Sequence, residues 1–271
     1  MQNPSISQDS EGDINRITNY RDTGPYCARN LMGALLKESE KVFQCLEQGL
    51  PIPDIRDKAL NGKIFTQKAY LSRKRNWDAV YIRYLKLPEW VLQDIIEAYK
   101  SGPHSAEFIS LLYLHYVLSD HLSFDFITQI LWDKWNTQNY SVSRDDILKM
   151  LDDASESESK INTYTDATRM RLSSIILSSL KHFGILSGKQ KKKLLKPVLP
   201  LATAEHILQI LTAEGMQGNL VIKDPIWRLF FCTENDVANY LQQLSFNRRI
   251  RFEKVGDTVM ITTPEEWENR K

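Results

Sequence analysis

The sequence has little of what marks secreted proteins, membrane proteins and most metalloproteins. Its three cysteines, Cys27, Cys45 and Cys232, lie far apart and form neither a disulfide framework nor a pair with metal-ligand spacing. Its most apolar tract, residues 108–118, is too short and too polar to span a bilayer. The polar, acidic N-terminus lacks the apolar core of a signal peptide. We therefore expect a cytoplasmic protein without a membrane segment.

The motifs of common catalytic sites are missing as well. The chain has no phosphate-binding P-loop, no dinucleotide-binding glycine motif, no zinc-protease helix motif and no nucleophile elbow. His115 and His121 are six residues apart and do not share a helix face, which favours structural histidines over metal ligands. A capped helix and an acidic loop explain the aspartate pairs at 145–146 and 152–153 better than a metal-dependent nuclease does. We expect no enzymatic activity, no metal and no cofactor.

What the chain does have is positive charge concentrated in two segments. Residues 56–86 contain nine Lys or Arg and two Asp, although the whole chain carries a net charge of only +1. Residues 181–196 contain six Lys and no acidic residue. Segregated positive charge attracts polyanions, because the phosphates that it neutralises release condensed counterions. The pattern favours nucleic-acid binding, while a solvated helix face and a solvated linker are the alternatives.

The periodicity of apolar residues predicts a mainly α-helical bundle, and the low content of glycine and proline disfavours a loop-rich β architecture. Residues 1–23 lack this periodicity, which predicts a flexible tail. We divide the rest into a helical domain at 24–160, with a helix-turn-helix-like basic segment, and a second part at 161–271. The acidic, Ser-rich stretch at 152–160 marks the boundary.

The basic helix predicted at 66–85 is amphipathic. Tyr70, Trp77, Tyr81 and Tyr84 share one arc of this helix, so we expect them to pack inward while the basic side chains face outward. In the C-terminal part, helices at 203–214 and 234–244 precede a hairpin at 249–263. This order is that of a winged-helix-like unit, and also of other small α+β units.

The order of these segments resembles the BrxA family of bacterial BREX phage-exclusion systems. The resemblance covers roughly residues 29–263 and rests on Leu35, Leu36, Glu38, Ile55-Arg56, Asn61, Ser72-Arg73, Arg83-Tyr84-Leu85, 111–127, 168–172 and 184–186. It implies a helical, cytoplasmic, non-enzymatic protein that binds double-stranded DNA in phage defence. It also implies that a methyltransferase, an ATPase and a phosphatase-like protein are encoded alongside. No catalytic residue follows from it.

The leading hypothesis is a DNA-binding accessory protein that contacts mainly phosphates, as long basic side chains spread over several segments do. The candidate contacts come from three segments: Lys68, Arg73, Lys74, Arg75 and Arg83; Lys189, Lys191, Lys192 and Lys193; Arg249 and Arg251. The alternative is an assembly adaptor that docks other defence components through the acidic stretch 145–158, without touching DNA. RNA binding and a metal-dependent nuclease remain open, as do base preference, oligomeric state and whether the basic clusters share one face.

Overall fold

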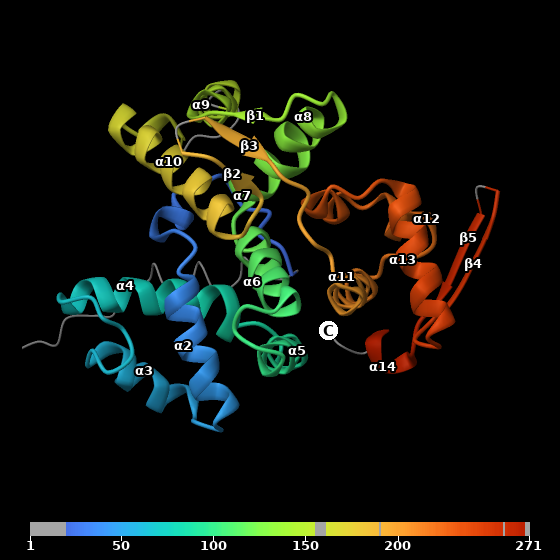
Figure 1. Ribbon diagram of the computed structural model, residues 1–271, viewed down its shortest axis with the longest axis horizontal. Helices are drawn as coiled ribbons and strands as arrows, with labels where there is room; N and C mark the ends of the chain where they lie inside the picture. The colour runs from blue at the N-terminus through green and yellow to red at the C-terminus, as the bar shows by residue number, and fades with distance from the viewer. Residues whose placement is uncertain (1–19, 155–160, 190, 257, 269–271) are drawn as a thin grey trace, which may run out of the picture.

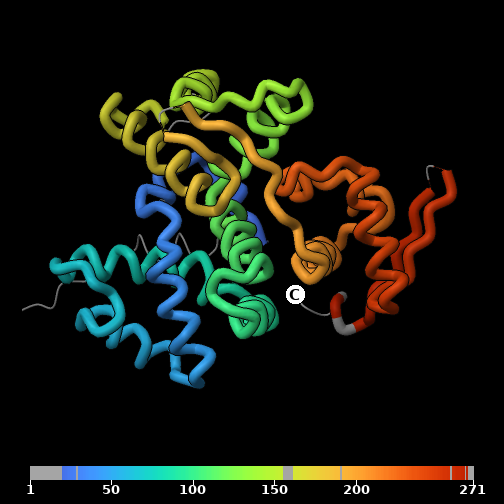
Figure 2. Tube along the Cα trace, viewed as in Figure 1, coloured from blue at the N-terminus to red at the C-terminus, as the bar shows by residue number. Residues whose placement is uncertain are grey.

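The structure, a computed structural model, describes residues 20–154, 161–189, 191–256 and 258–268 (Figure 1). It is mainly helical, as the sequence predicts. The described residues up to 195 form an N-terminal body, and those from 201 onward form a smaller C-terminal unit at its side (Figures 1 and 2). The expected tail at residues 1–19 and the stretch 155–160 lie outside the described residues.

The N-terminal body consists of helices and three short strands. Its elements are η1 (Arg29–Met32), α2 (Leu36–Glu47), α3 (Ile52–Leu60), α4 (Tyr70–Val80), the π-helical turn η2 (Tyr81–Leu85), α5 (Glu89–Lys100), α6 (Ala106–Leu118), α7 (His121–Asp125), the π-helical turn η3 (Phe126–Leu131), α8 (Trp132–Asn136), β1 (Ser141–Val142), α9 (Arg144–Asp153), η5 (Ile161–Thr163), α10 (Asp166–His182), β2 (Leu186–Ser187) and β3 (Lys192–Leu194).

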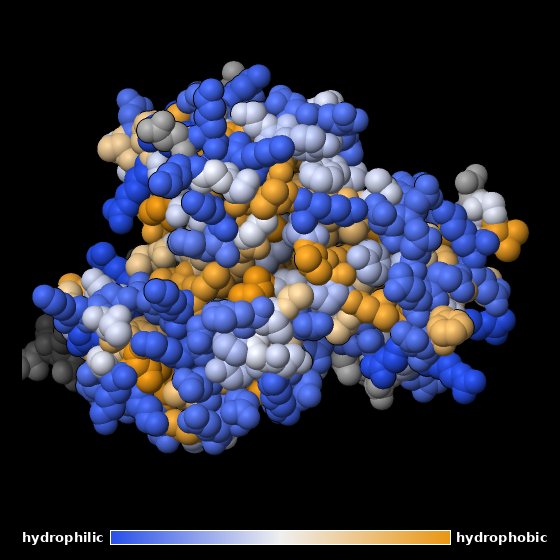
Figure 3. All heavy atoms as spheres, in the orientation of Figure 1, coloured by the Kyte–Doolittle hydropathy of each residue, from blue (hydrophilic) through white to orange (hydrophobic). Residues whose placement is uncertain are grey.

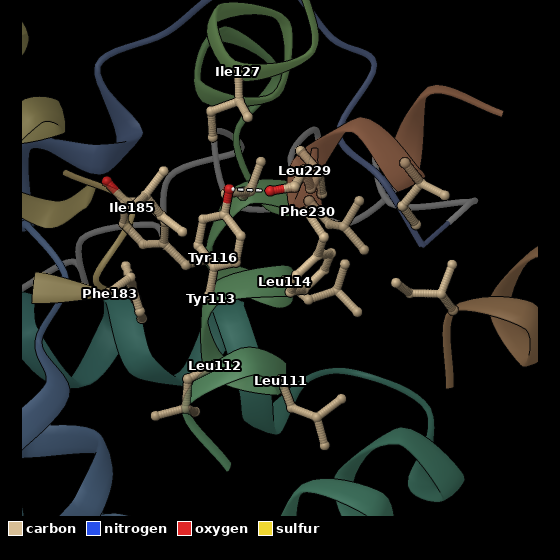
Figure 4. Packing of buried hydrophobic residues seen from close by; sticks show 14 of the residues in the cluster. Leu111, Leu112, Tyr113, Leu114, Tyr116, Ile127, Phe183, Ile185, Leu229 and Phe230 are labelled. Carbon is tan, nitrogen blue, oxygen red and sulfur yellow. Dashed lines mark hydrogen bonds between the residues drawn. The ribbon is translucent and has the colours of Figure 1, made fainter. Parts of the chain in front are cut away.

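Helix α6, which contains the most apolar tract of the sequence, is the centre of the core. Every side chain from Phe108 to Leu118 except Ile109 is buried. Tyr113 lies between Phe183 and Phe230, with ring centroids 5.6 and 5.5 Å away, and its hydroxyl donates a hydrogen bond to the Leu229 carbonyl at 2.9 Å (Figure 4). Because Leu229 and Phe230 belong to the C-terminal unit, α6 supplies part of the packing that joins the two parts of the molecule.

The aromatic side chains of the basic helix do not all pack inward. Trp77 and Tyr84 are buried, but Tyr70 is 51% exposed and Tyr81 is 38% exposed. From Tyr81 onward the helix becomes π-helical, with hydrogen bonds to the fifth residue instead of the fourth. This changes the angular spacing of the side chains, so the arc calculated for an ideal α-helix does not continue through the last turn.

A buried polar network crosses the body behind this turn. Arg83 is 1% exposed, and its guanidinium donates hydrogen bonds to the Gly33 carbonyl at 2.7 Å and to Asn30 Oδ1 at 2.8 Å. The amide of Asn30 donates in turn to Asp120 Oδ2 at 3.0 Å. The ring of Tyr116 lies 4.8 Å below the guanidinium carbon. A buried charge needs such partners, because an uncompensated one costs several kcal/mol.

The three short strands form one antiparallel sheet in the order β1-β3-β2. Ser141 pairs with Lys193, and Leu186 pairs with Leu194. Helices α9 and α10 lie between β1 and β2 in the chain and pack against each other. The sheet therefore ties residues on both sides of the expected boundary at 160 into one unit, because β1 precedes that boundary and its partner β3 follows it.

The C-terminal unit has the order of helices followed by a hairpin that the sequence predicts. It contains α11 (Leu201–Ala213), α12 (Asn219–Lys223), the 3-10 helix η6 (Pro225–Phe230), α13 (Glu234–Phe246), β4 (Arg251–Val255), β5 (Thr258–Thr262) and α14 (Glu265–Glu268). In the hairpin, Phe252 pairs with Ile261 and Lys254 pairs with Val259. The predicted hairpin is present, and Phe252 and Val259 of its two strands are buried.

Polar contacts as well as apolar packing join the unit to the body. The guanidinium of Arg21 forms ion pairs with Glu214 and Asp224, the latter at 2.8 Å. The flexible tail predicted at residues 1–23 therefore does not extend to Arg21, because these ion pairs fix Arg21 to the folded domain. Between α6 and α11, His115 Nε2 lies 2.9 Å from His206 Nε2, and burial holds the pKa of His115 well below its usual value.

Among the described residues, no helix is long and apolar enough to cross a membrane.

Replacing Arg83 with Ala should lower the free energy of unfolding by roughly 3 kcal/mol, because Asn30 and the Gly33 carbonyl would keep their burial without a charged donor. Arg83→Lys should recover only part of this, since an ammonium cannot reproduce the planar fork. Urea unfolding followed by circular dichroism measures the change. Arg75→Ala, at an exposed position of the same basic segment, is the control and should stay within about 0.5 kcal/mol of the wild type. An equally small effect of Arg83→Ala would contradict the structural role.

Candidate nucleic-acid interface

Two of the predicted phosphate contacts on the basic segment have structural roles instead. The guanidinium of Arg73 donates hydrogen bonds to the backbone carbonyls of Leu60, Gln67 and Lys68, each at 2.7 Å. It therefore holds the connection between α3 and α4. Arg83 is buried in the network described above and cannot reach a phosphate. Acceptors within the fold therefore already bind both guanidinium groups: three backbone carbonyls for Arg73, and the Gly33 carbonyl with Asn30 Oδ1 for Arg83.

The other basic residues of this segment do face solvent. Lys68, Lys74 and Arg75 are exposed. The ammonium of Lys74 forms an ion pair with Asp78 at 2.8 Å, in which both side chains are about half exposed. Such an exposed pair is weak. It leaves Lys74 able to exchange its partner for a phosphate, although part of its charge is neutralised locally.

The lysine cluster at 189–193 is built on a tight turn between β2 and β3. Gly188, at the start of this turn, has a φ of +90°, and a Cβ added to it would lie 2.3 Å from the Lys191 carbonyl oxygen, so only glycine fits. Lys189, Lys191 and Lys193 are exposed, while Lys192 is half-buried and donates from Nζ to the Lys189 carbonyl at 3.2 Å. The turn gathers the lysines at the tip and on one strand of a short hairpin. Gln190 lies outside the described residues.

The helices beside this hairpin are held firmly. Ser143 and Asp146 form the predicted capping box at the start of α9. Ile147 and Leu151 of α9 are buried, as are Leu172 and Ile176 of α10. Outside the core, the guanidinium of Arg169 pairs with Asp152 at 2.6 Å and so fastens α10 to the end of α9.

The outer face of α10 carries functional candidates that are not among the basic residues predicted from the sequence. Its exposed or half-exposed polar side chains are Arg171, Ser174, Ser178, Lys181 and His182. Their spacing of three, four, three and one places them on one side of the helix, opposite the buried leucines and isoleucines. The sequence of residues 166–183 does contain a signal for this face. Its apolar residues repeat at helical spacing and predict the core side, and the polar residues between them mark the opposite side. Two serines in this row leave room for close approach of another molecule.

A groove of about 600 Å³ runs beside this face, between α10 and the segment from η1 to the start of α2. Ser178 and His182 of α10 line one wall, and Leu35 and Leu36 line part of the other. The space-filling view shows the hollow between the upper and lower left parts of the molecule, with apolar atoms at its floor (Figure 3). The exposed face of α10 therefore borders a depression rather than a flat surface.

The basic residues of the C-terminal hairpin are paired with acids of the same unit. Arg249 contacts Glu205 at 2.6 Å, and Arg251 contacts Glu253 at 2.7 Å. The β4–β5 hairpin, which carries Arg251, is on the far right of the molecule, whereas α4 is at the lower left and β2 and β3 are at the top near the middle (Figure 1). Arg249 precedes β4 and contacts Glu205 of α11. The predicted set of basic residues thus falls on three separate places. Among the described residues, no group of three or more His, Cys, Asp or Glu is arranged to hold a metal ion.

Comparison with known proteins adds information on the chain up to about residue 210. The model of the BrxA family matches residues 30–210. "BREX protein BrxA" from Bacillus cereus (strain H3081.97) is 21% identical over 175 residues, covering 64% of this chain and 84% of that protein. The crystal structure of an uncharacterized protein from Magnetospirillum magneticum superimposes with a TM-score of 0.59 at 15% identity, over 77% of this chain and 100% of the other. At that identity, the superposition shows a shared fold only.

Replacing Arg73 with Ala should lower the free energy of unfolding by about 1–2 kcal/mol, because three backbone carbonyls would be left without their charged donor. The salt dependence of any nucleic-acid binding should not change, since backbone carbonyls already bind the Arg73 guanidinium. Arg75→Ala, two residues further along the same helix, should leave stability unchanged. Chemical denaturation of the two variants measures this difference. A stable Arg73→Ala protein with a reduced salt slope would show that Arg73 contacts phosphate after all.

Proposed function

The chain belongs to the BrxA family of BREX phage-defence systems, and from that premise we propose that it is a non-enzymatic accessory protein that binds double-stranded DNA in the cytoplasm, largely through the phosphate backbone. The observation that carries the proposal is the arrangement of β1, α9, α10, β2 and β3 in this order, with the sheet order β1-β3-β2.

This arrangement supports a winged helix, although at a different place from the one that the sequence suggested. In a helix-turn-helix unit, the first helix crosses the DNA backbone and the second enters the major groove. Here α9 takes the first position and α10 the second. The β2–β3 hairpin then extends beside α10 as the wing, and the lysine cluster at 189–193 lies at its tip and along β3.

The side chains on these elements have the chemistry that DNA requires. The outer face of α10 presents Arg171 and Lys181 around Ser174 and Ser178, so the middle of the helix can approach a groove while the basic residues reach its edges. The carboxylate of Asp166 is confined to the first turn of α10. Lysines on the wing contact phosphates as point charges, which suits binding that does not depend on sequence.

The exposed basic residues of the α4 segment have a supporting role in this proposal. Lys68 and Arg75 strengthen the positive potential without forming a site of their own. Arg73 and Arg83 do not belong to the proposed DNA-contacting set. Arg249 and Arg251 lie in exposed ion pairs with Glu205 and Glu253, away from this unit. The other BREX components that the resemblance implies are proposed partners, for which we assign no surface.

Replacing Lys189, Lys191 and Lys193 with Ala should weaken binding to any DNA duplex and lower the slope of log Kd against log salt by about one for each phosphate that is no longer neutralised. Arg171→Ala with Lys181→Ala should act in the same direction. Fluorescence anisotropy with a labelled duplex at several salt concentrations measures both effects. All of these side chains are exposed, so the unfolding transition should be unchanged.

The control replaces Lys223, an exposed lysine on α12, and should bind DNA like the wild type. Competition with structured RNA distinguishes duplex DNA as the preferred ligand from a general polyanion. A wild-type protein that binds no duplex at low salt would overturn the proposal and favour the adaptor role. Retention of a partner protein in nuclease-treated lysate would then be the next measurement.

A further inference from the structure

Three ionisable side chains form a row of hydrogen bonds across the junction between the N-terminal body and the C-terminal unit, where α6 contacts both α5 and α11 (Figure 1). Nε2 of His115, on α6, lies 2.9 Å from Nε2 of His206, on α11. Nδ1 of His206 lies 2.7 Å from Oδ2 of Asp94, on α5. The two histidines are 1% and 2% exposed, whereas the side chain of Asp94 is 38% exposed. The row therefore leads from the molecular surface to a fully buried imidazole.

The direction of these hydrogen bonds follows from the acceptor at the outer end of the row. An ionised carboxylate only accepts hydrogen bonds, so Nδ1 of His206 carries the proton that it donates to Asp94. In a neutral His206, Nε2 then has no proton and accepts the one on Nε2 of His115. Nδ1 of His115 is left without a proton, and it has no hydrogen-bond partner among the described residues. The closed junction thus suits two neutral imidazoles.

An added proton disrupts this arrangement wherever it binds. On Nδ1 of His115 it creates a buried cation and an N–H group without an acceptor. On Nε2 of His206 it makes both facing nitrogens donors, unless His115 shifts its own proton to Nδ1, where again no acceptor is present. Opening of the junction removes this conflict, because both imidazoles then reach water. The open junction therefore binds more protons than the closed one, and acid favours opening.

We propose that His115, His206 and Asp94 form a pH-sensitive latch, which holds α11 against α6 at neutral pH and releases it in mildly acidic solution. Burial and the neighbouring His206 hold the pKa of His115 well below its usual value. The stability that the neutral contact contributes is therefore complete above about 6.5, the pKa of an unperturbed histidine, and it is lost as the pH falls from there towards the lowered pKa. The latch controls how the C-terminal unit is held on the body, and it is separate from the proposed DNA-binding unit.

A pocket gives protons a route to the latch. It has a volume of about 330 Å³, and Asp94 and His206 both line it. The ring of Trp90 packs on His206 from the other side, with ring centroids 5.1 Å apart. A proton can thus pass from solvent to Asp94 and on to His206 before the core of the protein unfolds.

The other ionisable groups around the latch differ from it in charge or in titration range. The carboxylates that line the same pocket are those of Glu97 on α5, Glu107 on α6 and Glu205 on α11, the last paired with Arg249. Carboxylates ordinarily titrate about two pH units below histidine. Glu214, paired with Arg21, and the buried Asp120 follow the C-terminal ends of α11 and α6.

The remaining neighbours on and beside α6 keep their charge state throughout this range. Arg83 stays charged on the ring of Tyr116. Burial raises the pKa of the phenols of Tyr84, Tyr113 and Tyr116. His121 is hydrogen-bonded to Asp125 within the body, which raises the pKa of His121 to about 9. The His115–His206 contact is therefore the group at this junction whose protonation changes in mildly acidic solution.

The test places a thiol reporter in the junction of the full-length protein. Thr203 of α11 is fully buried against Ser110 of α6, with the two hydroxyl oxygens 2.7 Å apart, so Thr203→Cys gives a thiol that reacts only when the junction opens. Its reaction with 4,4′-dithiodipyridine, located by mass spectrometry and normalised to the urea-unfolded chain, measures the opening constant. Between about pH 6.5 and about pH 5.5 this constant should rise up to about tenfold, the limit for one additional proton in the open state.

Two variants in the reporter background separate a titrating latch from a structural contact. His115→Gln should abolish the pH dependence, because its amide can donate to a neutral His206 or accept from a protonated one. Tyr113→Phe removes the hydrogen bond to the Leu229 carbonyl at the same junction, so it should raise the opening constant by the same factor at every pH. Circular dichroism confirms that each variant is folded.

A measurement on the unsubstituted protein tests the proton positions directly. Imidazole ¹⁵N spectra at neutral pH should show His206 protonated at Nδ1 and His115 protonated at Nε2, both uncharged. A charged imidazole at either position, or the opposite tautomers, would contradict the latch.

The remaining outcomes also decide the matter. An opening constant that does not change with pH in the reporter protein would overturn the proposal. A pH dependence that persists in His115→Gln would assign the response to another group and give His115 a structural role only.

Discussion

The buried guanidinium of Arg83 is the constraint on which the arrangement of the N-terminal body depends. Through Asn30, the Gly33 carbonyl and the ring of Tyr116, it joins η1 and η2 to α6, and Asn30 extends the network to Asp120 before α7. A charge without these partners would destabilise the fold by several kcal/mol. Helix α10 packs directly against η1. The orientation of its exposed face relative to the rest of the body therefore follows from a polar network rather than from apolar packing alone.

The basic segment itself is a poor guide to a binding surface. Arg73 and Arg83 have the residue type and spacing of phosphate contacts, but backbone carbonyls bind both of them. Arginine suits this role because its fork reaches two acceptors at once and it stays charged when buried. Lysine, with a single point charge, is less suited to it. In this chain the exposed cluster at 189–193 is made of lysines, and the two cations of the basic segment that bind backbone carbonyls are arginines.

Local signals predicted much of the fold, and non-local pairing supplied what the sequence could not reveal. The helices α9, α10 and α13 begin at Ser143, Thr165 and Thr233, whose side chains cap them, and a cap is visible within four residues of sequence. The pairing of Ser141 with Lys193 joins distant residues through strands too short to show any alternation. Sequence patterns therefore favour a wing on the longer C-terminal hairpin, where Ile250 and Phe252 alternate with charged residues. The outer face of α10 could not be predicted as a functional surface in the same way, because its proposed role depends on the β1-β3-β2 sheet beside it.

The weak net charge of the chain determines what kind of DNA binding is physically reasonable. A net charge of +1 gives little long-range attraction, and at physiological salt each surface charge acts over about 8 Å. Binding must then come from cations that have no carboxylate beside them. Lys74, Arg249 and Arg251 each have such a neighbour, whereas the described structure places none within ion-pair distance of Lys189, Lys191, Lys193, Arg171 or Lys181. These five belong to α10 and the adjoining hairpin, and the exposed Lys68 and Arg75 of the α4 segment also have no carboxylate within ion-pair distance among the described residues. Positive charge is therefore available to a phosphate at both places.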